Sequence, residues 1–430
     1  MKALAIFGCL LASAVSLRAA TTLSDVNLSQ DAASGMVTVS YVTTGDPAIV
    51  TCDFLSDGVS LGEANFTRLH GDVNVKVSAG THSFTWAMAA ERVPIAGSLS
   101  VKLKAWSPST PPDYMVVDLV IPNSPVHYYV STNALPVGGL ANDVYRRHKL
   151  VMRRIPAKGV TFTMGSASGE SGRNADRETR HEVTFTHDYW LGIYPLTSRQ
   201  YANIIGTQPL WGYWVTNNVN DTRFVTVKMR DMRPQTNLSM NSLRGTTYYK
   251  AADGGPEKDT YAWPQKGFDV ATWSLIGKAR SRTGVQFDLP TDAQWEFACR
   301  AGTSTPYFFG NSMVTNGGWT NANKWPDGVL SPHPVGETLA NAYGLYDLYG
   351  NVLETCRDRL ESGAGQPGYT MPETAVTDPA GLEYSSTRNV VQRGGAYNWA
   401  NSQSRSGYRE RCDYGWNGNE RGVRFWAPID

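Results

Sequence analysis

The segment RGGAYNWANSQSRSGYRERCDYGWNGNERGVRF, residues 393–425, is dense in arginine, aromatic residues, asparagine and glycine. Gly394 and Gly395 permit a tight, closely packed backbone turn at its start. Tyrosine and tryptophan together with asparagine, serine and arginine are typical of binding loops, because rigid aromatic area is combined with adaptable hydrogen bonding. We therefore predict a ligand-binding face made by Tyr397, Trp399, Tyr408, Arg409, Tyr414 and Trp416.

The same segment has a second interpretation as structural scaffolding. In that interpretation Arg405 and Arg409 tie loops to buried carboxylates, and the tryptophans fill the core. The residue types alone leave both interpretations open for each residue.

The whole chain has 430 residues, enough for two domains, and a formal net charge of +1. This balance gives no indication of nucleic acid as a partner. Residues 1–20, MKALAIFGCLLASAVSLRAA, combine a lysine, a short apolar run and small closing residues, which is the pattern of an export signal. We expect a secreted or periplasmic protein without a transmembrane segment after signal cleavage.

Two domains are predicted from the change in character along the chain. Residues 21–125 hold short apolar runs with period-two alternation, such as MVTVSYV, HSFTWAM, LSVKLKAW and YMVVDLVI, separated by turn signals. This pattern indicates a small all-β sandwich. Residues 126–150 are interpreted as a linker, and residues 151–430 as a loop-rich α+β domain.

The second domain has three helical windows, at residues 197–206, 270–284 and 291–300. In the last one, Thr291 and Gln294 form the capping-box pattern, and Gly302 follows the end. A domain with so few regular elements must be held by loop hydrogen bonds, disulfides or bound cations.

Four cysteines remain after the predicted signal: Cys52, Cys299, Cys356 and Cys412. Export would place them where disulfides form, and four cysteines allow three pairings among which the sequence does not choose. The absence of a C-x-x-C motif argues against a zinc or thioredoxin-like site.

Five segments in order carry a family resemblance: IPAKGVTFTMGS (155–166), YWLGIYPLTSRQY (189–201), LPTDAQWEFACRAG (289–302), NAYGLYDLYGNVLE (341–354), and residues 393–425. Together they resemble the formylglycine-generating enzyme, or sulfatase-modifying factor, family. The resemblance covers residues 150–427 and implies a loop-rich C-type-lectin-like fold for the second domain. It also implies an oxidase that converts a sulfatase cysteine to formylglycine with copper(I) and oxygen.

The copper ligands of that family are two cysteines, and here the resemblance puts Trp399 and Ser404 at their positions. Tryptophan does not ligate metals, and a serine hydroxyl is a poor ligand for soft copper(I). Further departures are Ala396, Leu353 and Pro195 at other motif positions. The scaffold is therefore expected without the oxidase chemistry, and copper is not expected as a cofactor.

Calcium is the cofactor that we expect. Asp347 and Glu354 flank a turn, and two hard carboxylates beside free backbone carbonyls suit Ca²⁺. The resemblance assigns a site to the Asp347 and Glu354 side chains and the Gly350 and Val352 carbonyls. In the alternative, Asp347 caps a turn and Glu354 pairs with an arginine. The resemblance also assigns a second calcium site to Asn323, Lys324, Asp327 and Val329.

His181 and His187 are six residues apart but have no evident carboxylate partner, so we interpret them as solvated strand histidines. The function expected from the whole sequence is binding of an extracytoplasmic glycan or protein ligand by a calcium-stabilised domain. The alternative is a formylglycine-generating oxidase, or another oxidoreductase acting on sulfatase-type cysteine substrates.

Overall fold

The computed structural model describes residues 20–136, 138–207, 227–245, 270–323, 330–359, 374–379, 389–413 and 415–429. Most of the predicted export signal, residues 1–19, lies outside them. The chain divides into two compact units, Met1–Pro108 and Ser109–Asp430. No helix among the described residues is long and apolar enough to span a bilayer.

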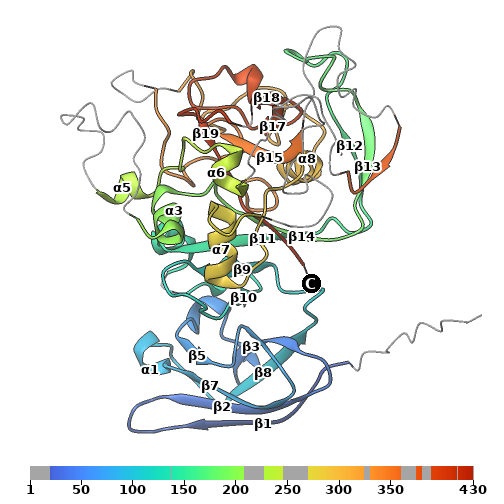
Figure 1. Ribbon diagram of the computed structural model, residues 1–430. Helices are drawn as coiled ribbons and strands as arrows, with labels where there is room; N and C mark the ends of the chain where they lie inside the picture. Colours follow the sequence, from blue (N-terminus) through green and yellow to red (C-terminus); the bar gives the residue numbers. More distant parts are fainter. Residues whose placement is uncertain are drawn as a thin grey trace, which may run out of the picture. The chain divides into compact units, whose positions relative to one another are not determined.

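The first unit is β-rich and contains two antiparallel sheets (Figure 1). One sheet has the order β1 (Thr22–Gln30), β2 (Val37–Thr44), β7 (Gly80–Trp86) and β5 (Leu69–Gly71). The other contains β4 (Val59–Ser60), β3 (Ala48–Ser56) and β6 (Val75–Val77), with β8 (Leu99–Trp106) also paired to β3. Two short helices complete it: η1 (Glu63–Asn65) and α1 (Met88–Glu91).

One apolar cluster is shared by both sheets of the first unit. Val39 of β2, Phe54 of β3 and Trp86 of β7 are fully buried in it, and the Phe54 and Trp86 rings pack with centroids 4.4 Å apart. The alternating pattern of β2 places every second side chain in this core, as the sequence pattern predicts.

The division between the units lies closer to the N-terminus than the boundary predicted at residue 125. The predicted strand 114–121 does form, as β9 (Tyr114–Asp118), but it pairs with β11 (Lys149–Ile155) of the second unit. Residues 126–150, interpreted as a linker, contain β10 (His127–Tyr129), which pairs with β9. The segment also contains η2 (Thr132–Ala134), η3 (Gly139–Ala141) and α2 (Val144–Arg147).

The described residues of the second unit form three sheets. The largest has the order β10, β9, β11, β14 (Tyr189–Gly192) and β20 (Trp426–Pro428). A second contains β12 (Thr161–Met164), β13 (His181–Thr184) and β16 (Val376–Thr377). The third has the order β18 (Glu410–Asp413), β17 (Asn389–Arg393), β15 (Leu353–Arg359) and β19 (Arg421–Gly422), and it carries the C-terminal motif (Figure 1).

The described helices of the second unit are short. They are α3 (Ser198–Ile205), α5 (Val227–Asp231), α6 (Met240–Arg244), α7 (Leu275–Thr283), α8 (Asp292–Arg300) and η5 (Asn401–Gln403). Of these, α3, α6, α7 and α8 begin at side-chain caps. All three predicted helical windows are confirmed as α3, α7 and α8. The capping box of Thr291 and Gln294 is present, and Thr197 with Gln200 forms a second one at α3.

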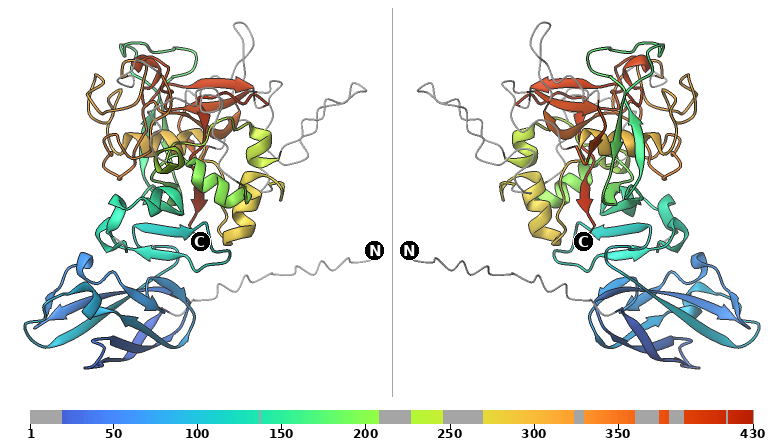
Figure 2. Two further views of the ribbon diagram at one scale, coloured as in Figure 1. Left: turned by 90° about the vertical axis from the view of Figure 1, so that its left-hand side faces the viewer. Right: turned by 90° about the vertical axis from the view of Figure 1, so that its right-hand side faces the viewer.

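Two apolar clusters form the core of the second unit. One gathers around Trp295, Ala298 and Cys299 of α8, and the other is contributed by α3, α6, α7 and strands of the five-stranded sheet. Helices α3 and α7 lie side by side (Figure 2). Helix α8 contacts β15 and β17, so it supports the sheet from which the C-terminal motif extends.

Candidate functional site

The double-glycine turn after β17 precedes Trp399 and Ser404, the two positions that the resemblance assigns to the family's copper cysteines. Gly394 and Gly395 have φ values of 86° and 73°, which favour glycine. A Cβ on Gly395 would lie 2.2 Å from Ser404 Oγ, so only glycine allows this close approach. Ser404 is fully buried, and among the described residues its hydroxyl has no hydrogen-bond partner.

Trp399 lies in a half-buried cluster at the surface. Its ring meets Tyr408 edge-on, with centroids 6.3 Å apart. Tyr408 donates its hydroxyl to Glu410 Oε2 (2.7 Å), and Arg177 pairs with Glu410 Oε1 (3.2 Å). Burial is the largest cause that raises the pKa of Tyr408, and the hydrogen bond to Glu410 raises this pKa further. We call Trp399, Tyr408, Glu410 and Arg177 the Trp399 cluster.

Two residues predicted for the ligand face are buried instead. Tyr397 and Arg409 are only 4% and 1% exposed. Arg409 pairs with Asp292 Oδ2 at 2.6 Å and donates to the Arg177 carbonyl at 2.6 Å. The prediction of an exposed role is therefore wrong for both, and the scaffolding interpretation holds for Arg409. Tyr414 lies outside the described residues.

Arg393 is the centre of a buried ion-pair network that the sequence analysis missed. Its guanidinium pairs with Asp292 and with Glu296 Oε2 (2.6 Å), and it donates to the Ser406 carbonyl (2.9 Å). Glu296 also pairs with Arg300 (2.8 Å). Burial alone would raise the pKa of Glu296, but the surrounding guanidinium groups hold it at about 2.

Arg405 fixes a second part of the motif to the loop of residues 167–178. It pairs bidentately with Glu178 (2.9 and 3.0 Å), and also with Glu170, and it donates to the Gly172 carbonyl. Arg405 is 2% exposed and Glu178 fully buried. The scaffolding interpretation thus holds for Arg405 as well.

Trp416 is exposed, unlike Tyr397 and Arg409. It is 43% exposed and follows β18, whereas Tyr408 of the Trp399 cluster precedes that strand.

Asp347, the first predicted calcium ligand, is a buried carboxylate. Its oxygens accept hydrogen bonds from the Gly336 amide (2.6 Å) and the Thr338 hydroxyl (3.2 Å). Burial raises the pKa of Asp347 to about 7, despite these bonds and the charge of Arg424. No ion pair of Asp347 is found within the described part of the chain. A bound cation would offset this cost, so Asp347 fits a calcium site.

Glu354, the second predicted carboxylate ligand, is already engaged. Arg424 binds it bidentately (2.6 and 2.9 Å), and the Trp295 indole donates to it at 2.6 Å. This is the arginine pairing of the alternative interpretation. Glu354 therefore fits a calcium site less well than Asp347.

The two predicted carbonyl donors flank Asn351 in the turn before β15. Gly350 has a φ of 78°, and a Cβ there would meet the Trp319 carbonyl oxygen at 1.8 Å. Val352 is buried against Gly422. The turn is thus held tightly at a position that only glycine can occupy.

The second predicted calcium site is only partly described. Asn323 Oδ1 accepts the Thr320 amide at 2.7 Å, so its oxygen already closes a local turn. Lys324, Asp327 and Val329 lie outside the described residues. Among those described, no group of three or more histidine, cysteine or acidic side chains is arranged to hold a metal ion.

The four cysteines within the described residues are unpaired. Cys52, Cys299, Cys356 and Cys412 form no disulfide, so none of the three pairings is present. Cys412 on β18 lies two strands from Cys356 on β15, a separation of about 10 Å. Burial raises the pKa of Cys299 and of Cys412 to about 11.

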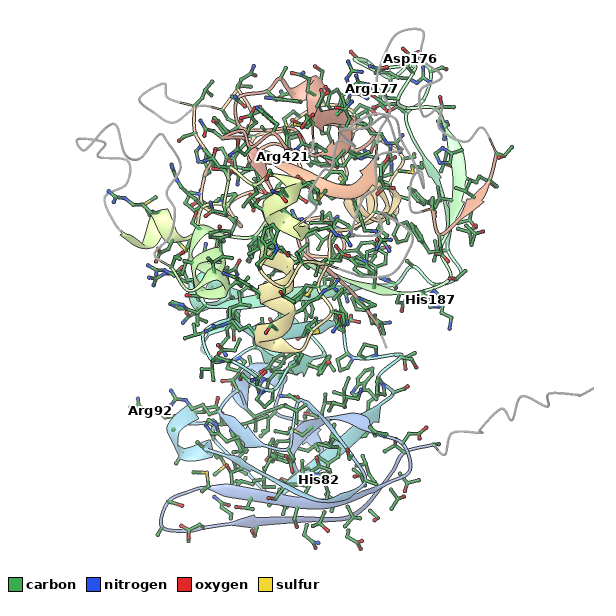
Figure 3. All side chains as sticks on the ribbon, in the orientation of Figure 1. His82, Arg92, Asp176, Arg177, His187 and Arg421 are labelled. Carbon is green, nitrogen blue, oxygen red and sulfur yellow. The ribbon has the colours of Figure 1, made fainter. Side chains whose placement is uncertain are left out.

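The two histidines on and after β13 differ from each other. His181 is buried, and burial lowers its pKa, so the expectation of a solvated histidine is wrong there. His187 is exposed at the edge of the second unit, where its ring contacts the Thr186 hydroxyl (Figure 3).

The sulfatase-modifying factor enzyme 1-like domain family matches residues 144–427. A formylglycine-generating enzyme of Streptomyces coelicolor is 34% identical over 265 residues, which are 57% of this chain and 77% of that protein. A Bos taurus protein named inactive C-alpha-formylglycine-generating enzyme 2 is 26% identical over 219 residues, 46% of this chain and 67% of that one. Other formylglycine-generating enzymes match over 25% to 69% of their own length.

The solved structure of PvdO from Pseudomonas aeruginosa aligns with 65% of this chain and 94% of its own, at 22% identity and a TM-score of 0.44. The family match spans well over half of the chain and contains the motifs described above. The chain therefore belongs to the sulfatase-modifying factor enzyme 1-like family, which includes the formylglycine-generating enzymes.

Proposed function

We propose that this protein is a non-oxidase, ligand-binding member of its family. The observation that carries the proposal is the chemistry at the two copper positions. Trp399 offers an aromatic ring that packs on Tyr408, and Ser404 offers a buried hydroxyl pressed against Gly395. Copper(I) prefers thiolates, and neither residue supplies one.

The remaining thiols are poor substitutes for the two missing ones. Their pKa values are raised by burial, so the thiolate form that ligates metal is disfavoured at neutral pH. Cys356 and Cys412 are also too far apart to share one two-coordinate ion. The name of the Bos taurus relative, inactive C-alpha-formylglycine-generating enzyme 2, supports the idea that the family contains members without the oxidase activity.

The ligand that we propose is an extracytoplasmic glycan or protein. Trp416 and the Trp399 cluster offer two aromatic surfaces beside polar groups, which is the composition of binding loops. The pattern of residues 1–20 supports a location outside the cytoplasm.

For the scaffold we propose a β-sandwich followed by a C-type-lectin-like, calcium-stabilised unit. The shared apolar cluster of the first unit supports the sandwich. The buried Asp347 carboxylate supports the cation, with the Gly350 and Val352 carbonyls as further donors.

The deciding experiment incubates the purified protein with copper(I) and a peptide that carries the sulfatase cysteine motif. We expect no aldehyde above the background without protein, and no stoichiometric copper in the purified protein. Aldehyde formed over many turnovers, and abolished by Cys412→Ser, would establish the oxidase alternative and overturn the proposal. In parallel, a glycan array and a panel of extracellular proteins test for the ligand.

A further inference from the structure

Trp416 rests on a glycine. A Cβ built on Gly418 would lie 2.2 and 2.4 Å from two atoms of the indole ring, so the absence of a side chain lets the ring lie over the backbone. The ring keeps 43% of its surface exposed. Among the described residues from 389 to 429, it is the one large apolar side chain that is exposed.

Arg421 fixes the backbone at Asp413 and Trp416. It is fully buried, and its guanidinium donates to the carbonyls of Trp416 and Asp413, the latter at 3.1 Å. Its Nε donates to Thr355 Oγ1 of β15 at 3.2 Å. The Trp416 amide donates to the Asp413 carbonyl (3.0 Å), and the Arg421 amide to Gly418 (3.1 Å). The backbone that carries the indole is therefore held in place before any ligand arrives, which reduces the entropic cost of binding.

Within the described part of residues 413–420, the side chains are acidic or neutral. Asp413 and Asn417 are exposed, and Glu420 is half-buried with a carboxylate oxygen 2.9 Å from the Cβ position of Gly418. Carboxylate and amide oxygens accept hydrogen bonds from hydroxyl and amino groups, and they repel anions.

We infer that the Trp416 loop, residues 413–420 without Tyr414, binds a neutral or amino-bearing sugar ring. The inference rests on the proposed ligand-binding function and names its ligand class. A pyranose ring has one apolar face of C–H groups and a rim of hydroxyls, which matches a single indole bordered by oxygen acceptors. A protein partner would need roughly 800 Å² of complementary surface per side, and one exposed indole surrounded by polar residues offers far less apolar area.

The experiment compares three proteins: wild type, Gly418→Ala and Gly169→Ala. Each is applied to an array of neutral hexoses, N-acetylhexosamines, hexosamines, uronates and sulfated sugars. The alanine methyl at 418 would displace the indole, whereas a Cβ at Gly169 meets nothing within 4 Å. Neither glycine has a positive φ, so neither variant strains the backbone.

We expect wild type and Gly169→Ala to bind neutral or amino sugars and not uronates or sulfated sugars. Gly418→Ala should bind at least ten-fold more weakly, and all three should melt within about a degree of one another. Preference for anionic sugars, or equal binding by Gly418→Ala, overturns the inference.

Two further outcomes separate the inference from the proposed function. A ligand, glycan or protein, whose binding is lost in Trp399→Ala but kept in Gly418→Ala leaves the binding function intact and overturns the assignment to Trp416. Absence of any ligand for wild type, on the array and on the protein panel, overturns both.

Discussion

Replacing Asp347 by asparagine is expected to stabilise the second unit at neutral pH when calcium is removed. The carboxylate is buried with its pKa raised from 3.8 to about 7. The folded state therefore holds a proton up to about pH 7, which the unfolded state releases near pH 4. The free energy of unfolding of the wild type falls as pH rises between these values and is constant above them. Asparagine does not titrate, so the free energy of unfolding of the variant does not fall in this way.

The size of the effect follows from the pKa difference. About three pKa units at 1.36 kcal/mol each correspond to about 4 kcal/mol at pH 8. The unfolding entropy is about 2.1 cal/mol/K per residue, and the unit Ser109–Asp430 has 322 residues, so this free energy corresponds to about 6 °C in melting temperature. The variant keeps the contacts, because its oxygen accepts from the Gly336 amide and its NH₂ donates to Thr338 Oγ1.

The measurement is a melting series from pH 4 to pH 8 in EDTA and in excess calcium. In EDTA the two proteins should melt together near pH 4 and diverge as pH rises, with Asp347→Asn the more stable. Calcium at pH 8 should raise the melting temperature of the wild type and leave the variant unchanged. Asp176→Asn, which removes the same charge from an exposed loop (Figure 3), is the matched control and should follow the wild type.

The pKa shift of Asp347 and its role as a calcium ligand can be refuted separately. Parallel curves for wild type and Asp347→Asn in EDTA across the whole range would show that burial does not shift this carboxylate. Equal stabilisation of both proteins by calcium would show that Asp347 is not a ligand.

Two other changes follow from the buried contacts. Glu354→Gln should lower the free energy of unfolding by about 3–5 kcal/mol in EDTA and in calcium alike, because it leaves the buried Arg424 without its charge partner. Denaturant titrations measure this loss. A loss confined to calcium-containing buffer would contradict the expectation. The double change Trp399→Cys with Ser404→Cys should create a site for about one copper(I) per chain. Metal analysis after dialysis measures the copper content. A copper content equal to that of the wild type would show that the two positions do not face each other.

The parts of the fold that depend on neighbouring residues could be predicted from the sequence. The capping box of Thr291 and Gln294 joins residues three apart, so its pattern can be recognised in the sequence. Helix α8 begins at the position that this pattern predicts. The strand at residues 114–118 was also recognisable. Its partner was not, because a period-two pattern does not say which strand it will pair with.

The partners of the buried arginines could not be predicted because they are far apart in sequence. Arg393 pairs with Glu296, nearly a hundred residues earlier, and Arg409 with Asp292. Arginine beside aromatic residues has the same composition in a binding loop and in a buried ion-pair network. Only the exposure of each side chain separates Trp416, which is on the surface, from Arg409, which is not.

The alkylation of the unpaired thiols can report local unfolding of this protein. Cys52 lies in the first unit, and Cys299, Cys356 and Cys412 lie in the second. Burial suppresses the reactive form of Cys299, Cys356 and Cys412, so alkylation of these three must wait until the second unit opens, whereas Cys52 is only half-buried. Timed exposure to a thiol reagent, followed by peptide mass analysis, would therefore give opening rates at three places in the second unit without any engineered label.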